Sequence, residues 1–327
     1  MDWETFLTAL YVMADDFCQL HPVPRSHRGP EAALTRSEAL TLAIFARWAR
    51  FASERDFYRW ARRHLCGAFP HLPDRPQWNR QVRSLQNDLA AVALHLAAEL
   101  QGSPGPYEAL DCTAAPTRNH KRRGRGWLPG QTDLGISNRC GWYHGFKILL
   151  SVHPNGPITG WGFGAASAKE QPLAEVFFAA RRMAGSGGEM CVRDPRLPGE
   201  GAARLSTAGM PTAQAYLADK GFQGAQTHRH WWQQYGAKVV APPQDNQVPA
   251  KHPWPKGLRR VLAGMRQIVE TVVEKLERPF ALLAERPHTL AGFAARLAAR
   301  VALHNFCIWL NRRLARPYLA FADLVEW

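Results

Sequence analysis

Tyr107-Glu108-Ala109-Leu110-Asp111-Cys112-Thr113 is a strand-like run that follows a break of glycine and proline at residues 102–106. The run predicts a short β-strand that ends on a carboxylate, Asp111. Helical patterns precede it and strand patterns follow it, and one long helical segment comes later. We therefore expect an α/β protein with an all-helical domain over residues 1–101, a second domain over 102–316 and a tail over 317–327.

Two further acidic residues stand at positions that match Asp111. Asp219 ends another strand-like run, residues 214–219, and Glu270 lies inside the helical segment 258–284. Two carboxylates at strand ends and one on a helix suit a pair of Mg²⁺ ions, which take oxygen ligands and are commonly shared with substrate phosphates. The sequence thus predicts an enzyme that acts on phosphodiesters through Asp111, Asp219 and Glu270, with Glu274 as the alternative third ligand.

The composition favours a polyanionic partner. The chain has 327 residues, 46% of them hydrophobic, and 41 Lys and Arg against 27 Asp and Glu give a net charge of +14. Such an excess favours nucleic acid as the partner. No run approaches the roughly 18 apolar residues of a membrane span, and the N-terminus lacks a basic signal region. We expect a cytoplasmic protein that does not associate with a membrane.

The six cysteines are scattered, without a CxxC pair. We expect reduced, unpaired thiols. Cys18 with His21, and His304 with Cys307, are local pairs that could in principle bind a metal. Their position on apolar helical faces favours packed side chains instead.

The N-terminal third predicts helices with basic edges. Thr35 and Glu38 form a capping box, Ser53 predicts a second helix start, and a third long helix is expected over 77–100. Three or four short helices of this kind fit a DNA-binding bundle of the helix-turn-helix type. The alternative is a helical cap or dimerisation domain whose arginines are merely solvated.

A basic segment follows the Asp111 strand. It contains five candidate DNA-binding residues: Arg118, Lys121, Arg122, Arg123 and Arg125. Such a run lies either in solvent or against nucleic acid. Its proximity to Asp111 in the sequence favours nucleic acid.

Residues 142–152 predict a buried strand that turns at 154–157 into a second strand, 158–166. Alternation directs Lys147 toward the Asp111 site, where it could contact a phosphate; alternatively it only marks the beginning of the strand. A helix is expected over 170–183, an irregular section after the glycines at 185–188, and a short strand at 238–241.

The segment 258–284 predicts one long helix. Arg266, Glu270 and Glu274 recur at intervals of four, on one face, with apolar residues on another. Arg266 could pair with Glu270 or hold a phosphate beside it. An ordinary solvated ladder of charges is the alternative. A final helix is expected over 289–316.

Four motifs in this order resemble bacterial insertion-sequence transposases of the DDE type. They are Ala109-Leu110-Asp111, Trp142-Tyr143-His144-Gly145-Phe146-Lys147, Tyr216-Leu217-Ala218-Asp219-Lys220-Gly221-Phe222 and Arg266-Gln267-Ile268-Val269-Glu270-Thr271. Their separations also agree, with 108 residues from Asp111 to Asp219 (219 − 111) and 51 from Asp219 to Glu270 (270 − 219).

The resemblance implies an RNase H-like mixed sheet flanked by helices, and an enzyme that cuts and rejoins DNA at terminal inverted repeats. Asp111, Asp219 and Glu270 would hold two Mg²⁺ ions, for which Mn²⁺ can substitute, while Lys147, Lys220 and Arg266 would contact DNA. One ion would activate the attacking water or 3′-hydroxyl and the other would stabilise the leaving oxygen. The partners would be the terminal repeats and target DNA, the assembly a homodimer, and the location the nucleoid.

Three positions depart from the family pattern. Ala263 replaces a tyrosine, Glu277 replaces a lysine, and Lys169-Glu170 replaces a common His-Asp pair. The phosphate contacts that relatives make at the first two positions are either absent here or supplied by Lys275 and Arg278. Two other functions stay open: a nuclease or domesticated transposase of the same fold without strand transfer, and a DNA-binding protein without catalysis.

Overall fold

The computed structural model describes residues 1–23, 32–119, 121, 128–183, 189–208, 213–243, 254–284 and 286–327. Arg122, Arg123 and Arg125 of the basic segment lie outside the described residues. Within the described ranges, no helix combines the length and the apolar character needed to cross a membrane.

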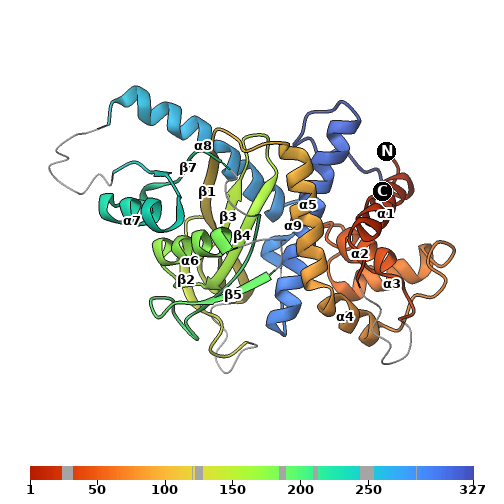
Figure 1. Ribbon diagram of the computed structural model, residues 1–327. Coiled ribbons are helices and arrows are strands. Elements are labelled where there is room, and N and C mark those ends of the chain that lie inside the picture. Colours follow the sequence, from red (N-terminus) through yellow and green to blue (C-terminus); the bar gives the residue numbers. More distant parts are fainter. Residues whose placement is uncertain are drawn as a thin grey trace.

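A mixed β-sheet forms the centre of the molecule, with helices on both faces (Figure 1). Its strand order is β5-β6-β4-β3-β1-β7-β8, and β2 also pairs with β3. β1 and β7, and β7 and β8, are parallel, whereas the other neighbours are antiparallel. The strands are β1 (Glu108–Arg118), β2 (Asp133–Ser137), β3 (Gly141–Val152), β4 (Ile158–Ala165), β5 (Glu189–Arg193), β6 (Ala202–Thr207), β7 (Tyr216–Leu217) and β8 (Val239–Val240).

Alternation along the strands builds two cores. Ala109, Ile148 and Leu150 face one side, together with helices α8 (Lys256–Glu277) and α9 (Leu290–Arg313). Leu110 and Leu149 face the other side, against α6 (Glu170–Met183) and α7 (Ala225–Tyr235). Because successive side chains of a strand point to opposite faces, β1 and β3 contribute to both cores. The predicted hairpin of β3 and β4 is confirmed.

Helices precede the sheet, as expected, but the described residues form five rather than the predicted three or four: α1 (Trp3–Leu20), α2 (Arg36–Phe45), α3 (Glu54–His64), α4 (Arg75–Ser84) and α5 (Gln86–Gln101). The capping box of Thr35 and Glu38 begins α2, and the Ser53 side chain caps α3. The single helix predicted over 77–100 is wrong, because α4 starts at the Asp74 cap and a new helix begins after Leu85.

The N-terminal helices share one hydrophobic core with α8, α9 and one face of the sheet. Phe6 of α1 contacts Phe306 of α9 edge to face, with ring centroids 5.3 Å apart, within the roughly 4.5–7 Å that is usual for aromatic pairs. The C-terminal tail returns to this region, where Glu326 forms a β-bridge with Asp2 (Figure 1). The division of the chain into domains at residues 101 and 316 stays a prediction.

Several predicted boundaries are corrected. β1 continues to Arg118, so Asp111 lies inside the strand rather than at its end. α8 ends at Glu277, and Leu282–Ala284 is a separate turn of 3₁₀ helix, η2. The section expected to be irregular contains β5 and β6. The strand before Asp219 is reduced to the two residues of β7.

Candidate active site

Asp111 lies on β1, and Asp219 lies two residues after the end of the neighbouring parallel strand β7. β1 pairs with β7 through Glu108 with Tyr216 and Ala109 with Leu217, an offset of 108 residues (216 − 108). Asp111 and Asp219 differ by the same 108 residues (219 − 111). Continued in that register, the two carboxylates come side by side just beyond the paired residues. The spacing between Asp111 and Asp219 in the sequence therefore matches the register in which β1 pairs with β7.

A buried ion pair fixes the start of β1. Glu108, three residues before Asp111, pairs with Arg181 of α6, and both side chains are fully buried. Ser151 of β3 also donates to Glu108, at 2.6 Å. Removing either partner of a buried pair leaves an uncompensated charge, which is strongly destabilising. The pair thus ties β1, β3 and α6 together directly beside the aspartates.

A cavity of about 440 Å³ opens along the edge of β1 where its pairing with β7 ends. Residues from β1, β3, α6, α8 and the end of β7 reach this edge from both faces of the sheet. The charged residues among its lining are Asp111, Arg139, Lys147, Glu170, Asp219, Arg266 and Glu270. All three carboxylates singled out in the sequence, together with Lys147 and Arg266, therefore line one cavity.

Burial raises the pKa of the Asp111 carboxyl to about 7. The Arg266 guanidinium, 3.7 Å from Asp111 Oδ2, opposes this shift, and the Asp219 and Glu170 carboxylates reinforce it. The backbone N–H of Cys112 donates to Asp111 Oδ1 at 2.7 Å. Near neutral pH the carboxyl is thus close to its midpoint, as expected for a buried acid among other acids.

Glu170 is a fourth carboxylate of this cavity that the sequence did not assign to the site. It is the first residue of α6, and burial raises its pKa, as does Asp219, while Lys147 and Arg266 lower it. A Cβ at Gly221 would collide with Glu170 Oε2, so the glycine makes room for the acid. The replacement of His-Asp by Lys169-Glu170 was the one signal in the sequence.

Glu270 and Glu274 differ in their surroundings. Glu270 lines the cavity, one helical turn after Arg266. Glu274 is exposed, as Glu270 is, but pairs with Arg278 at 3.0 Å instead of lining the cavity. The geometry therefore favours Glu270 as the third acidic residue of the site.

The last turn of α8 is anchored to the sheet by Glu277. Its carboxylate accepts a hydrogen bond from Thr113 Oγ1 at 3.2 Å and pairs with Arg139 at 3.1 Å. Lys275 lies over the ring of Phe321, and Arg278 pairs with Glu274. Neither side chain points to the cavity, so neither is in position to make the phosphate contacts expected of it.

Among the residues that the structure describes, the other candidate DNA-binding cations, Arg118, Lys121 and Lys220, lie apart from the cavity lining. Arg118 is partly buried at the end of β1, and Lys121 is exposed nearby. Lys220 is exposed in the 3₁₀ turn η1 (Lys220–Phe222) that follows Asp219, whose side chain caps that turn through the N–H of Gly221 at 2.8 Å. Lys147 and Arg266 are thus the two predicted cations that reach the acids.

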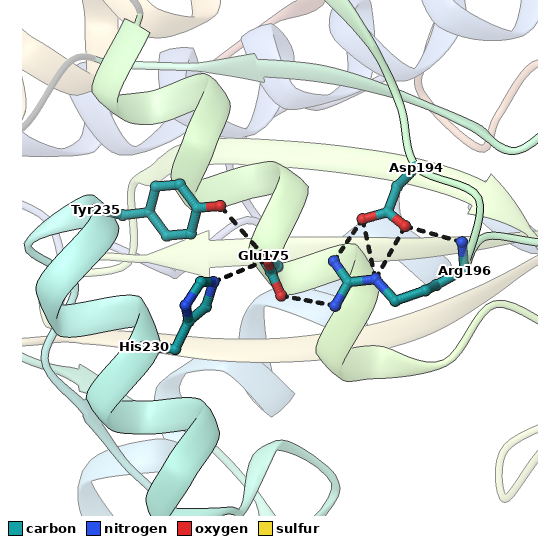
Figure 2. A network of polar contacts seen from close by, with 5 residues as sticks. All are labelled: Glu175, Asp194, Arg196, His230 and Tyr235. Atoms are coloured by element: carbon teal, nitrogen blue, oxygen red, sulfur yellow. Dashed lines mark hydrogen bonds and ion pairs between the residues drawn. The ribbon is translucent and has the colours of Figure 1, made fainter.

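A larger cavity, about 1150 Å³, adjoins the first and shares Lys147 and Glu170 with it. Figure 2 shows the polar network on its wall. Glu175 of α6 accepts hydrogen bonds from Arg196 at 3.0 Å and from Tyr235 of α7 at 3.4 Å, and lies 3.1 Å from His230 Nε2. Asp194 binds the other side of Arg196. The network ties the turn after β5 to α6 and α7, and so fixes this wall.

Within the described ranges, no group of three or more His, Cys, Asp or Glu side chains is arranged to hold a metal ion. At the His304 and Cys307 pair, His304 Nε2 lies 3.0 Å from the carbonyl oxygen of Gly156, and burial lowers the pKa of the imidazole to about 4. Cys307 is fully buried. These residues pack the core, as expected.

Comparison of the chain with family models, with curated proteins and with solved structures finds no match. Fold and site therefore carry the functional argument alone.

Proposed function

We propose that this chain is a DNA transposase of the DDE type that cuts and rejoins DNA at the terminal inverted repeats of an insertion sequence. The observation that carries the proposal is one cavity lined by Asp111, Asp219 and Glu270 together with three cations, Arg139, Lys147 and Arg266. Acids far apart in a sequence rarely converge beside lysine and arginine without a chemical role, because grouping like charges costs free energy.

The proposal includes an RNase H-like fold for the sheet domain. The mixed sheet supports it, since β1 is an interior strand that carries the first acid, and the parallel neighbour β7 leads into the second. The third acid comes from α8, which packs on one face of β1. The strand β1, the turn that follows β7 and the helix α8 thus supply the three acids.

The donors of this cavity are of the kind that divalent cations take, although no three of the described carboxylates are arranged around one ion position. Carboxylate oxygens are the hard ligands that Mg²⁺ prefers, and Mn²⁺ accepts the same donors. In this proposal Asp111, Asp219 and Glu270 hold two ions. When bound, such ions lower the pKa of an attacking water or hydroxyl and stabilise the leaving oxygen.

The chain's own cations orient the substrate. Arg266 presents a planar guanidinium beside Asp111 and can bind two phosphate oxygens at once, whereas Lys147 acts as a point charge on the opposite wall. Together they hold a phosphodiester against the acids. The substrate is DNA in this proposal because the net charge of +14 suits a long polyanion. A homodimer would bring the two ends of the element together.

The direct test offers the protein the DNA that flanks its own gene, with Mg²⁺ and a pre-cleaved terminal repeat. Joining of the free 3′ end to a target plasmid is the expected result. Cleavage without joining would instead support a nuclease of the same fold. Binding with neither reaction would support a DNA-binding protein without catalysis, and overturn the proposal.

A further inference from the structure

A second charged cavity lies at the junction of α3, α4, η2 and α9, remote in sequence from the candidate active site. Its volume is about 340 Å³. Six arginines line it: Arg47, Arg55, Arg75, Arg286, Arg296 and Arg300. Among the described residues of its lining, Glu54 is the only acid. We call this site the arginine cavity.

The floor of the arginine cavity is built from arginines held in place. Arg47 and Arg300 are 6% and 5% exposed. Glu54 lies 3.8 Å from Arg47 and 3.3 Å from Arg296. Arg300 donates to the carbonyl oxygens of Phe280 at 2.6 Å and Ala281 at 3.3 Å. Their positions are therefore fixed before any ligand arrives, and pre-organised groups lose less entropy on binding.

The rim is formed by the exposed Arg55, Arg75 and Arg286. Arg55 lies in the first turn of α3, and Arg75 is the first residue of α4. A cation at a helix N-terminus opposes the helix dipole, so these two arginines do not serve helix stability. Their placement is instead suited to an anion that bridges the two helix starts. A smaller cavity with Arg83 and His288 continues the basic surface.

The arginine cavity is connected to the candidate active site through β1. Arg286 donates to the carbonyl oxygen of Pro116 at 3.4 Å, and Pro116 is five residues beyond Asp111 on the strand. At roughly 3.3 Å per residue, the two points are about 16 Å apart. Since duplex DNA rises about 3.4 Å per base pair, this span to the near edge of the cavity, at Arg286, corresponds to roughly five base pairs.

We propose that the arginine cavity binds backbone phosphates of the DNA, about five base pairs from the bond held at Asp111 and Asp219. The choice of DNA as the source of phosphate rests on the proposed function. Arginine suits this role because its guanidinium binds phosphate oxygens in pairs. The N-terminal helices thereby contribute to DNA binding through the cavity that they form with α9 and η2.

The test uses the full chain with Arg55→Ala and Arg75→Ala combined, since both side chains are exposed and the change should not disturb folding. Affinity for a terminal-repeat duplex is measured without Mg²⁺ over a range of salt concentrations. We expect at least tenfold weaker binding, and a salt slope smaller by about two. The hydroxyl-radical footprint should lose protection roughly five base pairs from the cleavage position.

The matched control combines Arg193→Ala and Arg229→Ala, which remove the same charge from exposed positions on β5 and α7. It should bind nearly as wild type. Arg55→Lys with Arg75→Lys keeps the charge but loses the planar fork, so its affinity should fall between wild type and the alanine pair. Equal affinity of the alanine pair and the control pair would overturn the proposal.

A second arm separates DNA from a free anion. If inorganic phosphate raises the melting temperature of wild type but not of the alanine pair, while DNA affinity is the same for both, the cavity is a free-anion site and the proposal fails. Binding that needs Arg55 and Arg75 in a chain that never cuts DNA would refute the transposase and keep this inference. DNA cleavage that does not need Arg55 and Arg75 would support the transposase and refute this inference.

Discussion

The surroundings of Asp111 make the charged form of its carboxyl group unfavourable. Burial raises the pKa of its carboxyl to about 7, well above the ordinary value of 3.8. The unfolded chain therefore loses this proton at lower pH than the folded chain. The charged carboxylate consequently destabilises the fold increasingly as pH rises from about 4 to 7, and fully above that range.

We expect Asp111→Asn to be more stable than wild type at pH 8, by at most about 4 kcal/mol, with the advantage vanishing near pH 3.5. Unfolding free energies measured in denaturant without divalent metal, from pH 3.5 to 8, give the curve. Asp16→Asn, at an exposed position on α1, is the control and should follow wild type. A constant difference across the range would contradict the account of Asp111.

Gly221 makes the approach of Glu170 possible, since a Cβ there would collide with Glu170 Oε2. Gly221→Ala should therefore displace the Glu170 carboxylate from the cavity, at a cost of under about 1 kcal/mol because this carboxylate is the far end of a flexible side chain. Gly264→Ala is the matched control on α8, where a Cβ meets nothing within 4 Å, and it should stabilise by up to about 1 kcal/mol. Thermal unfolding measures the stability of both variants. Equal changes in melting temperature would contradict the account of Gly221.

At the scale of elements, Glu277 connects the last turn of α8 to β1 and Arg139. Glu277→Ala should cost about 1–2 kcal/mol, because it removes a partly buried hydrogen bond and an ion pair. Glu274→Ala removes an exposed pair from the same helix and should cost under about 0.5 kcal/mol. Urea unfolding measures the free energy of unfolding of the two variants. Should Glu274→Ala prove the more costly, α8 is anchored elsewhere.

Patterns of neighbouring residues predicted the helices and strands that neighbouring residues alone determine. The cap of Thr35 and Glu38, the β3 and β4 hairpin and the helix α6 follow from adjacent residues. The break between α4 and α5 at Leu85 involves neither glycine nor proline. Leu85 and Leu89 are both buried in the core, so tertiary packing decides this break.

The residues of the candidate site were predictable from the sequence to about the same extent as the elements of the fold. Strand ends and helical spacing indicated Asp111, Asp219, Glu270, Lys147 and Arg266, which all line one cavity. Glu170 escaped because it reads as an ordinary first residue of a helix, and only the close approach of α6 to Gly221 brings it to the acids. β5 and β6 escaped because glycines and prolines between and around these short strands mask their alternation.

At the scale of the whole molecule, the N-terminal helices and the sheet are parts of one packed body. Their common core includes residues of α1, α2, α5, α8 and α9. The arginine cavity lies where α3 and α4 meet α9, and β1 leads from there to the acids. A duplex that contacts both cavities would therefore be held rigidly, which favours accurate placement of the reacting bond.

The central claim is that Asp111, Asp219 and Glu270 form one phosphodiester-cutting site. Its most direct test is Mg²⁺-dependent cleavage of a terminal-repeat duplex by Asp219→Ala, with duplex affinity measured in parallel and Glu274→Ala as the control. We predict that Asp219→Ala reduces cleavage by at least about a thousandfold while affinity is kept, and that Glu274→Ala cuts as wild type. Cleavage by Asp219→Ala at the wild-type rate would contradict the account.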